Sequence, residues 1–197
     1  MSWQSYIETL LYSMIRAGTP LLIGTLGEIY AERSGVLNLG VEGMVIIGAV
    51  TGYVVTLTTG NPWLGIIAAA FAGGALSLIH AFFSISLRAN QVVSGLALTM
   101  LGLGLSSVIG RLYIGIPLPS SITPFEIPVL SKLPIIGPAI FSQDPLVYFS
   151  MIIAPIMWFI LFKTSIGIKI RAVGENPAAA DAAGINVYMI RYICVFI

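Results

Sequence analysis

Two polar side chains interrupt an apolar stretch near the start of the chain. Asn38 and Glu42 lie four residues apart, a spacing that places two side chains on one face of an α-helix. A charged side chain inside a bilayer costs about 3 kcal/mol on insertion scales, so it must face a bundle interior, a partner or water. The pattern predicts that Asn38 and Glu42 line a translocation path. The alternative is that Glu42 pairs with Arg16 or Arg33 and only holds helices together.

The same stretch is rich in glycine. Gly35, Gly40 and Gly43 lie within nine residues of one another, and glycine weakens a regular helix. We therefore expect a broken or kinked helix at the start of this segment.

A second polar constellation runs from Arg88 to Thr99 and offers Ser94 and Thr99 as further path residues. Gly95, Thr99 and Gly102 share one helix face by their spacing. The alternative for Thr99 is a hydrogen bond from its hydroxyl group to the backbone carbonyl four residues earlier.

The residue types exclude several kinds of chemistry. His80 is the only histidine and Cys194 the only cysteine, so a histidine metal cluster and a disulfide within the chain are excluded, and we expect His80 to be a hydrogen-bonded packing residue. Nothing resembles a nucleophile motif, so we expect no catalytic residue and no enzyme. No lysine follows a glycine, as a phosphate-binding loop requires. We expect no cofactor in this chain, so any ATP must bind to another subunit.

The stretch Ser165–Ile185 is a polar island in an apolar sequence. Asn176 suits an N-cap, Pro177 the first helical turn and Gly184 the position after the helix end. The alanine-rich residues between them predict a short helix that is too short to be stable alone. A small, smooth-sided, capped helix of this kind suits the groove of another protein.

The composition requires an integral membrane protein. Hydrophobic residues make up 57% of the chain and charged residues 9%, whereas soluble domains carry about 25% charge. A spanning helix needs about 20 apolar residues. Five segments qualify, and a sixth begins near Val187 and reaches the last residue, Ile197; the five are Ile7–Gly27, Val36–Thr58, Pro62–Leu87, Val92–Tyr113 and Pro145–Phe162. We predict an all-α transmembrane bundle over residues 1–197, truncated within its sixth span.

The basic residues set the orientation. Arg33, Arg88 and the group at 163–171 fall at joints on one side, which places the island in the cytoplasm, while Lys132 falls on the other side. The outer loop Ile114–Asp144 contains six prolines, so we expect it to be irregular. Small residues recur every four positions from Gly65 to Ala81, and Gly48 and Gly52 form a second pair, a pattern that favours close helix packing.

Three stretches resemble the permease subunit of bacterial ABC importers, in the group that includes branched-chain amino acid, ribose and nucleoside permeases. They are Glu28–Met44, Asn90–Thr99 and Arg171–Ile185. The first two are similar to the nucleoside and simple-sugar branch, and the third to the cytoplasmic coupling loop that docks on the ATPase. The chain departs from the pattern at Gln91, where an acidic residue is expected, and at Thr99, where an asparagine is expected.

The resemblance implies a multi-pass protein of the bacterial plasma membrane. Its expected partners are ABC ATPase subunits that bind ATP, a second permease subunit and an extracytoplasmic solute-binding protein. It places the coupling loop at about 164–186, and the residues expected to contact the ATPase are Gly174, Glu175, Asn176, Pro177, Ala180, Asp181, Gly184 and Ile185. The implied substrate is a nucleoside or simple sugar. The alternatives are an ion-coupled secondary transporter that uses Glu42, and a membrane enzyme or scaffold.

Overall fold

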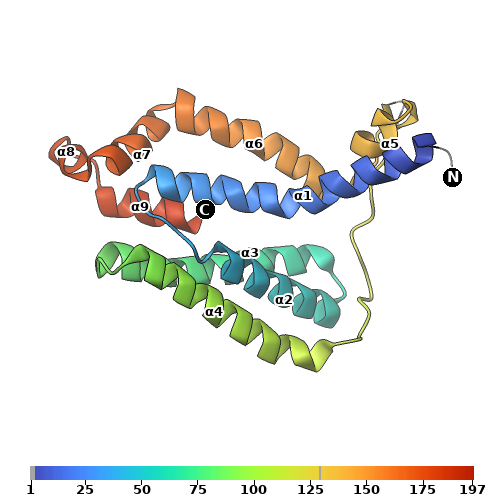
Figure 1. Ribbon diagram of the computed structural model, residues 1–197, viewed down its shortest axis with the longest axis horizontal. Helices are drawn as coiled ribbons and strands as arrows, with labels where there is room; N and C mark the ends of the chain where they lie inside the picture. Colours follow the sequence, from blue (N-terminus) through green and yellow to red (C-terminus); the bar gives the residue numbers. More distant parts are fainter. Residues whose placement is uncertain (1–2, 129) are drawn as a thin grey trace. The chain divides into compact units, whose positions relative to one another are not determined.

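The computed structural model describes residues 3–128 and 130–197, without the side chain of Lys132. Within these ranges the regular structure is helical and contains no strand, which confirms the predicted all-α class. The α-helices are α1 (Trp3–Arg33), α2 (Val41–Thr59), α3 (Pro62–Ala81), α4 (Gln91–Gly110), α5 (Ile136–Phe141), α6 (Pro145–Lys163), α7 (Ser165–Glu175), α8 (Pro177–Ala182) and α9 (Val187–Phe196) (Figure 1). Three short turns complete the described elements: the π-helical turn η1 (Phe82–Ser86) and the 3-10 turns η2 (Arg111–Tyr113) and η3 (Leu130–Lys132).

Four helical segments in the described ranges are long and apolar enough to cross a membrane. They are Val41–Thr59, Pro62–Ser86, Gln91–Tyr113 and Pro145–Lys163, and they match four of the five predicted spans. The remaining predicted span, Ile7–Gly27, lies within α1. Charged residues such as Glu8 and Arg16 interrupt it, and α1 is not among the four. The chain is therefore a multi-pass helical protein.

The chain divides into two compact units. Unit 1 comprises Met1–Leu26 and Ile122–Trp158, and unit 2 comprises Gly27–Ser121 and Phe159–Ile197. Both units thus contain segments that are far apart in the sequence.

Polar contacts hold unit 1 together. Arg16 and Asp144 form an ion pair with 3.0 Å between Nε and Oδ2. The Glu8 carboxylate accepts the N–H of Ile135, and the Gln143 amide donates to the carbonyl of Tyr12. An ion pair and two hydrogen bonds therefore connect the first part of α1 to the segment that precedes α6.

The proline-rich loop is less irregular than expected. No helix occurs at residues 114–128, but η3 and α5 follow. Pro138 lies in the first turn of α5, where its missing N–H would have no intrahelical partner in any case. This is why a proline-containing segment forms a helical turn where an irregular loop was expected.

Helices α2, α3 and α4 lie side by side in unit 2 (Figure 1). A Cβ atom placed on Gly48 would lie 3.2 Å from the carbonyl oxygen of Ala69, and one on Gly52 would lie 3.1 Å from that of Gly65. The predicted small-residue faces therefore pack against each other, which confirms close helix approach. Gly43 of α2 likewise contacts Gly102 of α4, where a Cβ on Gly102 would lie 2.5 Å from the carbonyl oxygen of Gly43.

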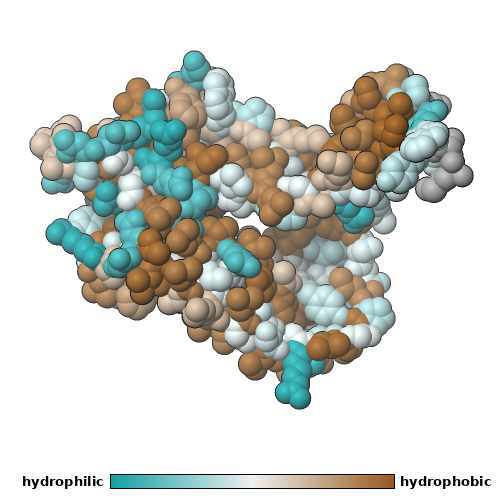
Figure 2. Space-filling view, in the orientation of Figure 1, coloured by the Kyte–Doolittle hydropathy of each residue, from teal (hydrophilic) through white to brown (hydrophobic). Residues whose placement is uncertain are grey.

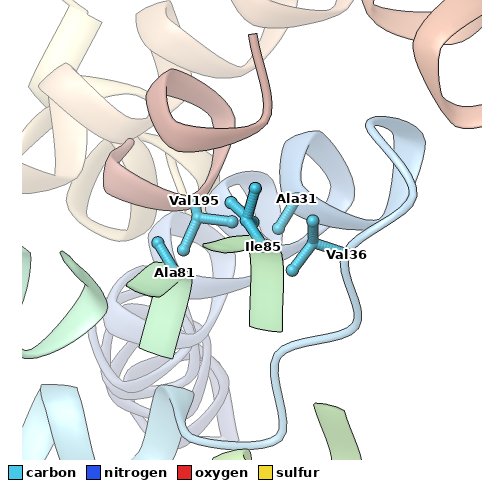
Figure 3. Close-up of a cluster of buried hydrophobic side chains, with 5 residues drawn as sticks. All are labelled: Ala31, Val36, Ala81, Ile85 and Val195. Carbon is cyan, nitrogen blue, oxygen red and sulfur yellow. The ribbon is translucent and has the colours of Figure 1, made fainter. Parts of the chain in front are cut away.

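A small apolar cluster joins several elements of unit 2. Val36 and Ala81 are 1% and 0% exposed, and they pack with Ala31, Ile85 and Val195 (Figure 3). These residues come from α1, the segment that follows it, α3, η1 and α9. The cluster therefore packs the chain just after α1 against α9.

Candidate functional site

The segment Ser34–Gly40 leaves α1 and crosses to α2 without forming a helix. The predicted second span begins later than expected, at Val41, so Asn38 and Glu42 do not share a helix face. That prediction was wrong for a local reason. Gly35 has φ +85°, and the Asn38 side chain accepts the N–H of Gly40 at 3.0 Å, a turn that competes with helix formation. The expected break in the helix is present, as a non-helical segment.

Side chains from other helices hold the backbone of the Ser34–Gly40 segment. The Glu28 carboxylate accepts the N–H of Asn38 at 3.0 Å. The Gln91 side-chain oxygen accepts the N–H of Leu37 at 2.9 Å, and its nitrogen lies 3.5 Å from the carbonyl oxygen of Gly35. Because buried backbone groups need partners, these side chains are what allow a non-helical segment to run between packed helices.

His80 and Ser94 form part of the same arrangement. His80 is fully buried, and its Nε2 lies 3.1 Å from the carbonyl oxygen of Leu37. A carbonyl oxygen only accepts, so Nε2 carries a proton, and in the neutral imidazole Nδ1 then accepts from the Ser94 hydroxyl group at 3.1 Å. The prediction that His80 is a hydrogen-bonded packing residue is confirmed.

Thr99 binds the far end of the segment. Its hydroxyl group lies 3.0 Å from the carbonyl oxygen of Leu39 and 3.3 Å from that of Gly95. The expected bond to the carbonyl four residues earlier is present, and a second acceptor comes from the crossing segment. Gly95 has no room for a side chain, since a Cβ there would lie 2.8 Å from the Leu39 nitrogen. The segment is thus pressed directly onto α4.

The four predicted path residues lie at different depths. Asn38 is 5% exposed, Ser94 and Thr99 are half-buried, and Glu42 is exposed in the first turn of α2. A carboxylate in a first helical turn is stabilised by the helix dipole. The two arginines suggested as partners of Glu42 make other contacts: Arg16 binds Asp144 in unit 1, and Arg33 lies over the ring of Phe162.

The polar island folds into two helices. The predicted short helix is α8, and its caps are as expected: Asn176 accepts the N–H of Ala179 at 3.0 Å, and Gly184 has φ +80°. The N–H groups of Gly184 and Ile185 donate to Asp181 and Ala180 respectively, which is the Schellman pattern. Helix α7 was not predicted from the sequence; Thr164 is its N-cap.

The surface of α8 is mostly exposed, but Ala180 is only 4% exposed. Ala180 therefore packs inward and fixes α8 to its own chain. The other residues of α8 are exposed, and so is its C-cap Ala183; within α8 they are Pro177, Ala178, Ala179, Asp181 and Ala182. Figure 2 shows hydrophilic surface gathered around α7 and neighbouring elements, and hydrophobic surface over α4.

The chain that leads into α8 touches the Ser34–Gly40 segment. A Cβ on Gly174 would lie 2.3 Å from the carbonyl oxygen of Arg33 and 3.2 Å from the nitrogen of Gly35. The two backbones are therefore in direct contact. Among the predicted coupling residues, Gly174 makes this backbone contact with the Ser34–Gly40 segment. Glu175 and Asp181 are exposed.

A cleft of about 500 Å³ lies beside α8. Pro177, Ala178 and Asp181 line it from α8, and other elements contribute Arg88, Gln91, Tyr188 and Arg191 among its lining residues. The Tyr188 hydroxyl group accepts from Arg88 at 3.3 Å, a bond that raises the pKa of the Arg88 guanidinium. Arg191 donates from Nε to the carbonyl oxygen of Ser34 at 3.0 Å.

The described residues contain no group of three or more His, Cys, Asp or Glu side chains placed to hold a metal ion.

Residues 10–197 match the family model described as branched-chain amino acid transport system / permease component. The chain belongs to this permease family. A relative in Bacillus subtilis, the guanosine ABC transporter permease protein NupQ, is 47% identical over 90% of this permease chain and 59% of its own length. The putative glucose ABC transporter permease protein TsgC13 of Haloferax volcanii is 42% identical over 98% of the chain and 60% of its own length.

A third relative, the nucleoside ABC transporter permease protein NupC of Lactococcus lactis, is 36% identical over 94% of the chain and 62% of its own length. The permease chain thus spans about three fifths of the length of these curated relatives. No solved structure matches it. The family consists of transport components, in agreement with the prediction that the chain is not an enzyme.

Proposed function

We propose that the protein to which this chain belongs is a membrane-spanning subunit of an ATP-driven importer, and that its substrate is a nucleoside or simple sugar. The observation that carries the proposal is α8, a capped helix with an exposed alanine surface between a membrane-spanning helix and α9. Such a helix suits a groove in an ATPase subunit. The names of the relatives, which refer to guanosine, nucleoside and glucose transporters, support the substrate class.

The proposed architecture has five complete spans, with Ile7–Gly27 of α1 as the first, and α9 begins a sixth. The bundle lies in the bacterial plasma membrane with α7 and α8 on the cytoplasmic side. Asn38, Glu42, Ser94 and Thr99 line or border the path, and the coupling surface extends from Gly174 to Ile185. ATP binds to the partner ATPase subunits, a second permease subunit completes the path, and a solute-binding protein delivers the substrate.

In this proposal ATP acts by changing the relative stability of two arrangements of the spans. A ligand shifts such an equilibrium only through its different affinity for the two states. Closure of the ATPase subunits would supply this difference, and α8 would carry it into the permease.

The test is uptake of labelled solute by proteoliposomes that contain the full-length permease, its partner permease and its ATPase subunits. With the binding protein outside and ATP inside, we expect uptake of guanosine or glucose, and none when the ATPase is catalytically inactive. Uptake driven by a proton gradient without ATP would contradict the proposal and favour an ion-coupled transporter.

A further inference from the structure

The Ser34–Gly40 segment lies between the α8 cleft and the predicted path residues. Its first half contacts residues of the cleft, and its second half carries Asn38 and touches Thr99. We propose that Gln91 and Arg191 are positioning residues that transmit a displacement of α8 to this segment and so to the path. The inference rests on the proposed function, because it names the route by which α8 acts.

Two side chains that line the cleft are hydrogen-bonded to the backbone of the segment. Arg191 holds the carbonyl oxygen of Ser34 at 3.0 Å. Gln91 holds the N–H of Leu37 at 2.9 Å and lies 3.5 Å from the carbonyl oxygen of Gly35. Both line the same cleft as Pro177, Ala178 and Asp181 of α8. A movement of α8 that widens or narrows the cleft therefore acts on the two side chains that are hydrogen-bonded to the segment.

A backbone contact runs beside these hydrogen bonds. Gly174 touches Arg33 and Gly35 with no space for a side chain, and it stands two residues before the N-cap of α8. A displacement of α8 that moves the end of α7 with it would therefore press on the segment from a second point.

The far half of the segment transfers the displacement to the path. Asn38 is held by Glu28, and Leu39 by Thr99. Since the segment is not helical, it can adjust through its backbone dihedral angles, as hinge segments do in switching proteins. Val36, which is 1% exposed, packs against Ala31 and Ile85 and so fixes this part of the segment in place (Figure 3).

The first test compares variants of the full-length permease in the reconstituted importer by the amount of solute taken up per ATP hydrolysed. Gln91→Leu and Arg191→Gln each remove hydrogen bonds to the segment, and we expect each to lower the ratio about fivefold, the equilibrium change that corresponds to one net hydrogen bond. Gln91→Glu keeps an acceptor for the Leu37 N–H and should retain most of the wild-type ratio.

Arg88→Gln is the matched control for Arg191→Gln. Both remove one guanidinium group from the same cleft, but Arg88 donates its hydrogen bond to Tyr188 and not to the segment. Arg88→Gln should keep the wild-type ratio. A wild-type ratio in Gln91→Leu, or equal losses in Arg88→Gln and Arg191→Gln, would overturn the inference.

A second test needs no transport. Ala178→Trp fills the cleft from α8, and in the full-length permease we expect it to raise amide hydrogen exchange at Leu37 several-fold. In a Gln91→Leu background the same substitution should add little, because coupled residues are not additive. Fully additive effects would contradict the inference. If the wild-type importer shows no ATP-driven uptake, the proposed function fails, and this exchange measurement still decides the role of Gln91.

Discussion

Arg16 and Asp144 form an ion pair in which the acid is the more buried partner. Their Nε and Oδ2 atoms are 3.0 Å apart, and the side chains are 53% and 12% exposed respectively. The second carboxylate oxygen of Asp144 is buried and lacks a hydrogen-bond partner among the described residues. The pair therefore neutralises a carboxylate that water reaches poorly.

Because Asp144 is the more buried partner, substitution of Arg16 and substitution of Asp144 should lower the stability of the protein by different amounts. Arg16→Gln leaves a buried carboxylate without its cation and should lower the stability of the protein by about 1–3 kcal/mol. Asp144→Asn leaves a half-exposed arginine that water can solvate, so its cost should stay below about 1 kcal/mol. Thermal unfolding of the full-length protein in detergent measures both. The double variant should be about as stable as Asp144→Asn alone. Equal losses of stability in the two single variants would show that burial of Asp144 is not the cause.

Local rules were sufficient to predict α8. An N-cap asparagine, a proline in the first turn and a glycine after the last turn all lie within nine residues, and the structure has each in its expected role. Helix α7 obeys similar rules, with Thr164 as its cap. It was missed because its charged residues marked the region as polar rather than as an amphipathic helix.

The arrangement around the Ser34–Gly40 segment could not be predicted in the same way. Gln91 meets Leu37 across 54 positions of sequence, and His80 meets the same residue across 43. Helix periodicity says which residues share a face, but it does not say which backbone groups of a distant segment need partners. The sequence did mark Gly35, Gly40 and Gly43 as breakers, and this was the available signal that the helix begins later than Val36.

The crossing of α2 and α4 predicts a strong difference between two glycines of one helix. A Cβ on Gly102 would lie 2.5 Å from the carbonyl oxygen of Gly43, whereas nothing lies within 4 Å of one on Gly104. Gly102→Ala should destabilise the protein by about 1–3 kcal/mol, as overpacking does. Gly104→Ala should be neutral or stabilising by up to about 1 kcal/mol through helix propensity. Thermal unfolding in detergent distinguishes them, and equal stabilities would mean that the helices are not in contact at this crossing.

The proposed orientation predicts the accessibility of two lysine positions. In a full-length Cys194→Ala protein, a cysteine at position 132 should react with an impermeant thiol reagent added to intact cells. A cysteine at position 169, in α7, should react only after the cells are opened. Labelling of position 169 from outside would reverse the orientation and remove α8 from the side where ATP is available.

Glu42 is predicted to act through its charge rather than through packing. It is exposed in the first turn of α2, so Glu42→Gln keeps the size of the side chain and disturbs no buried contact. We expect solute uptake to fall several-fold while the amount of protein in the membrane stays near normal. The loss of a favourable charge near the helix N-terminus is worth only about 0.3–1 kcal/mol, too little to unfold the protein. A fall in membrane abundance with unchanged uptake per molecule would instead assign Glu42 a structural role.

The proposed docking of an ATPase on α8 is best tested at Ala182. Ala180 is unsuitable because it is only 4% exposed, so a large residue there would disrupt the fold of α8 itself. Ala182 is exposed, and Ala182→Trp should place its ring in the space that the ATPase groove would occupy. We expect the full-length variant to reach the membrane in normal amounts, to co-purify with much less ATPase and to lose ATP-driven uptake. Ala182→Ser keeps a small side chain and should behave like the wild type. If the tryptophan variant retains both its ATPase and its uptake, α8 is not the docking helix.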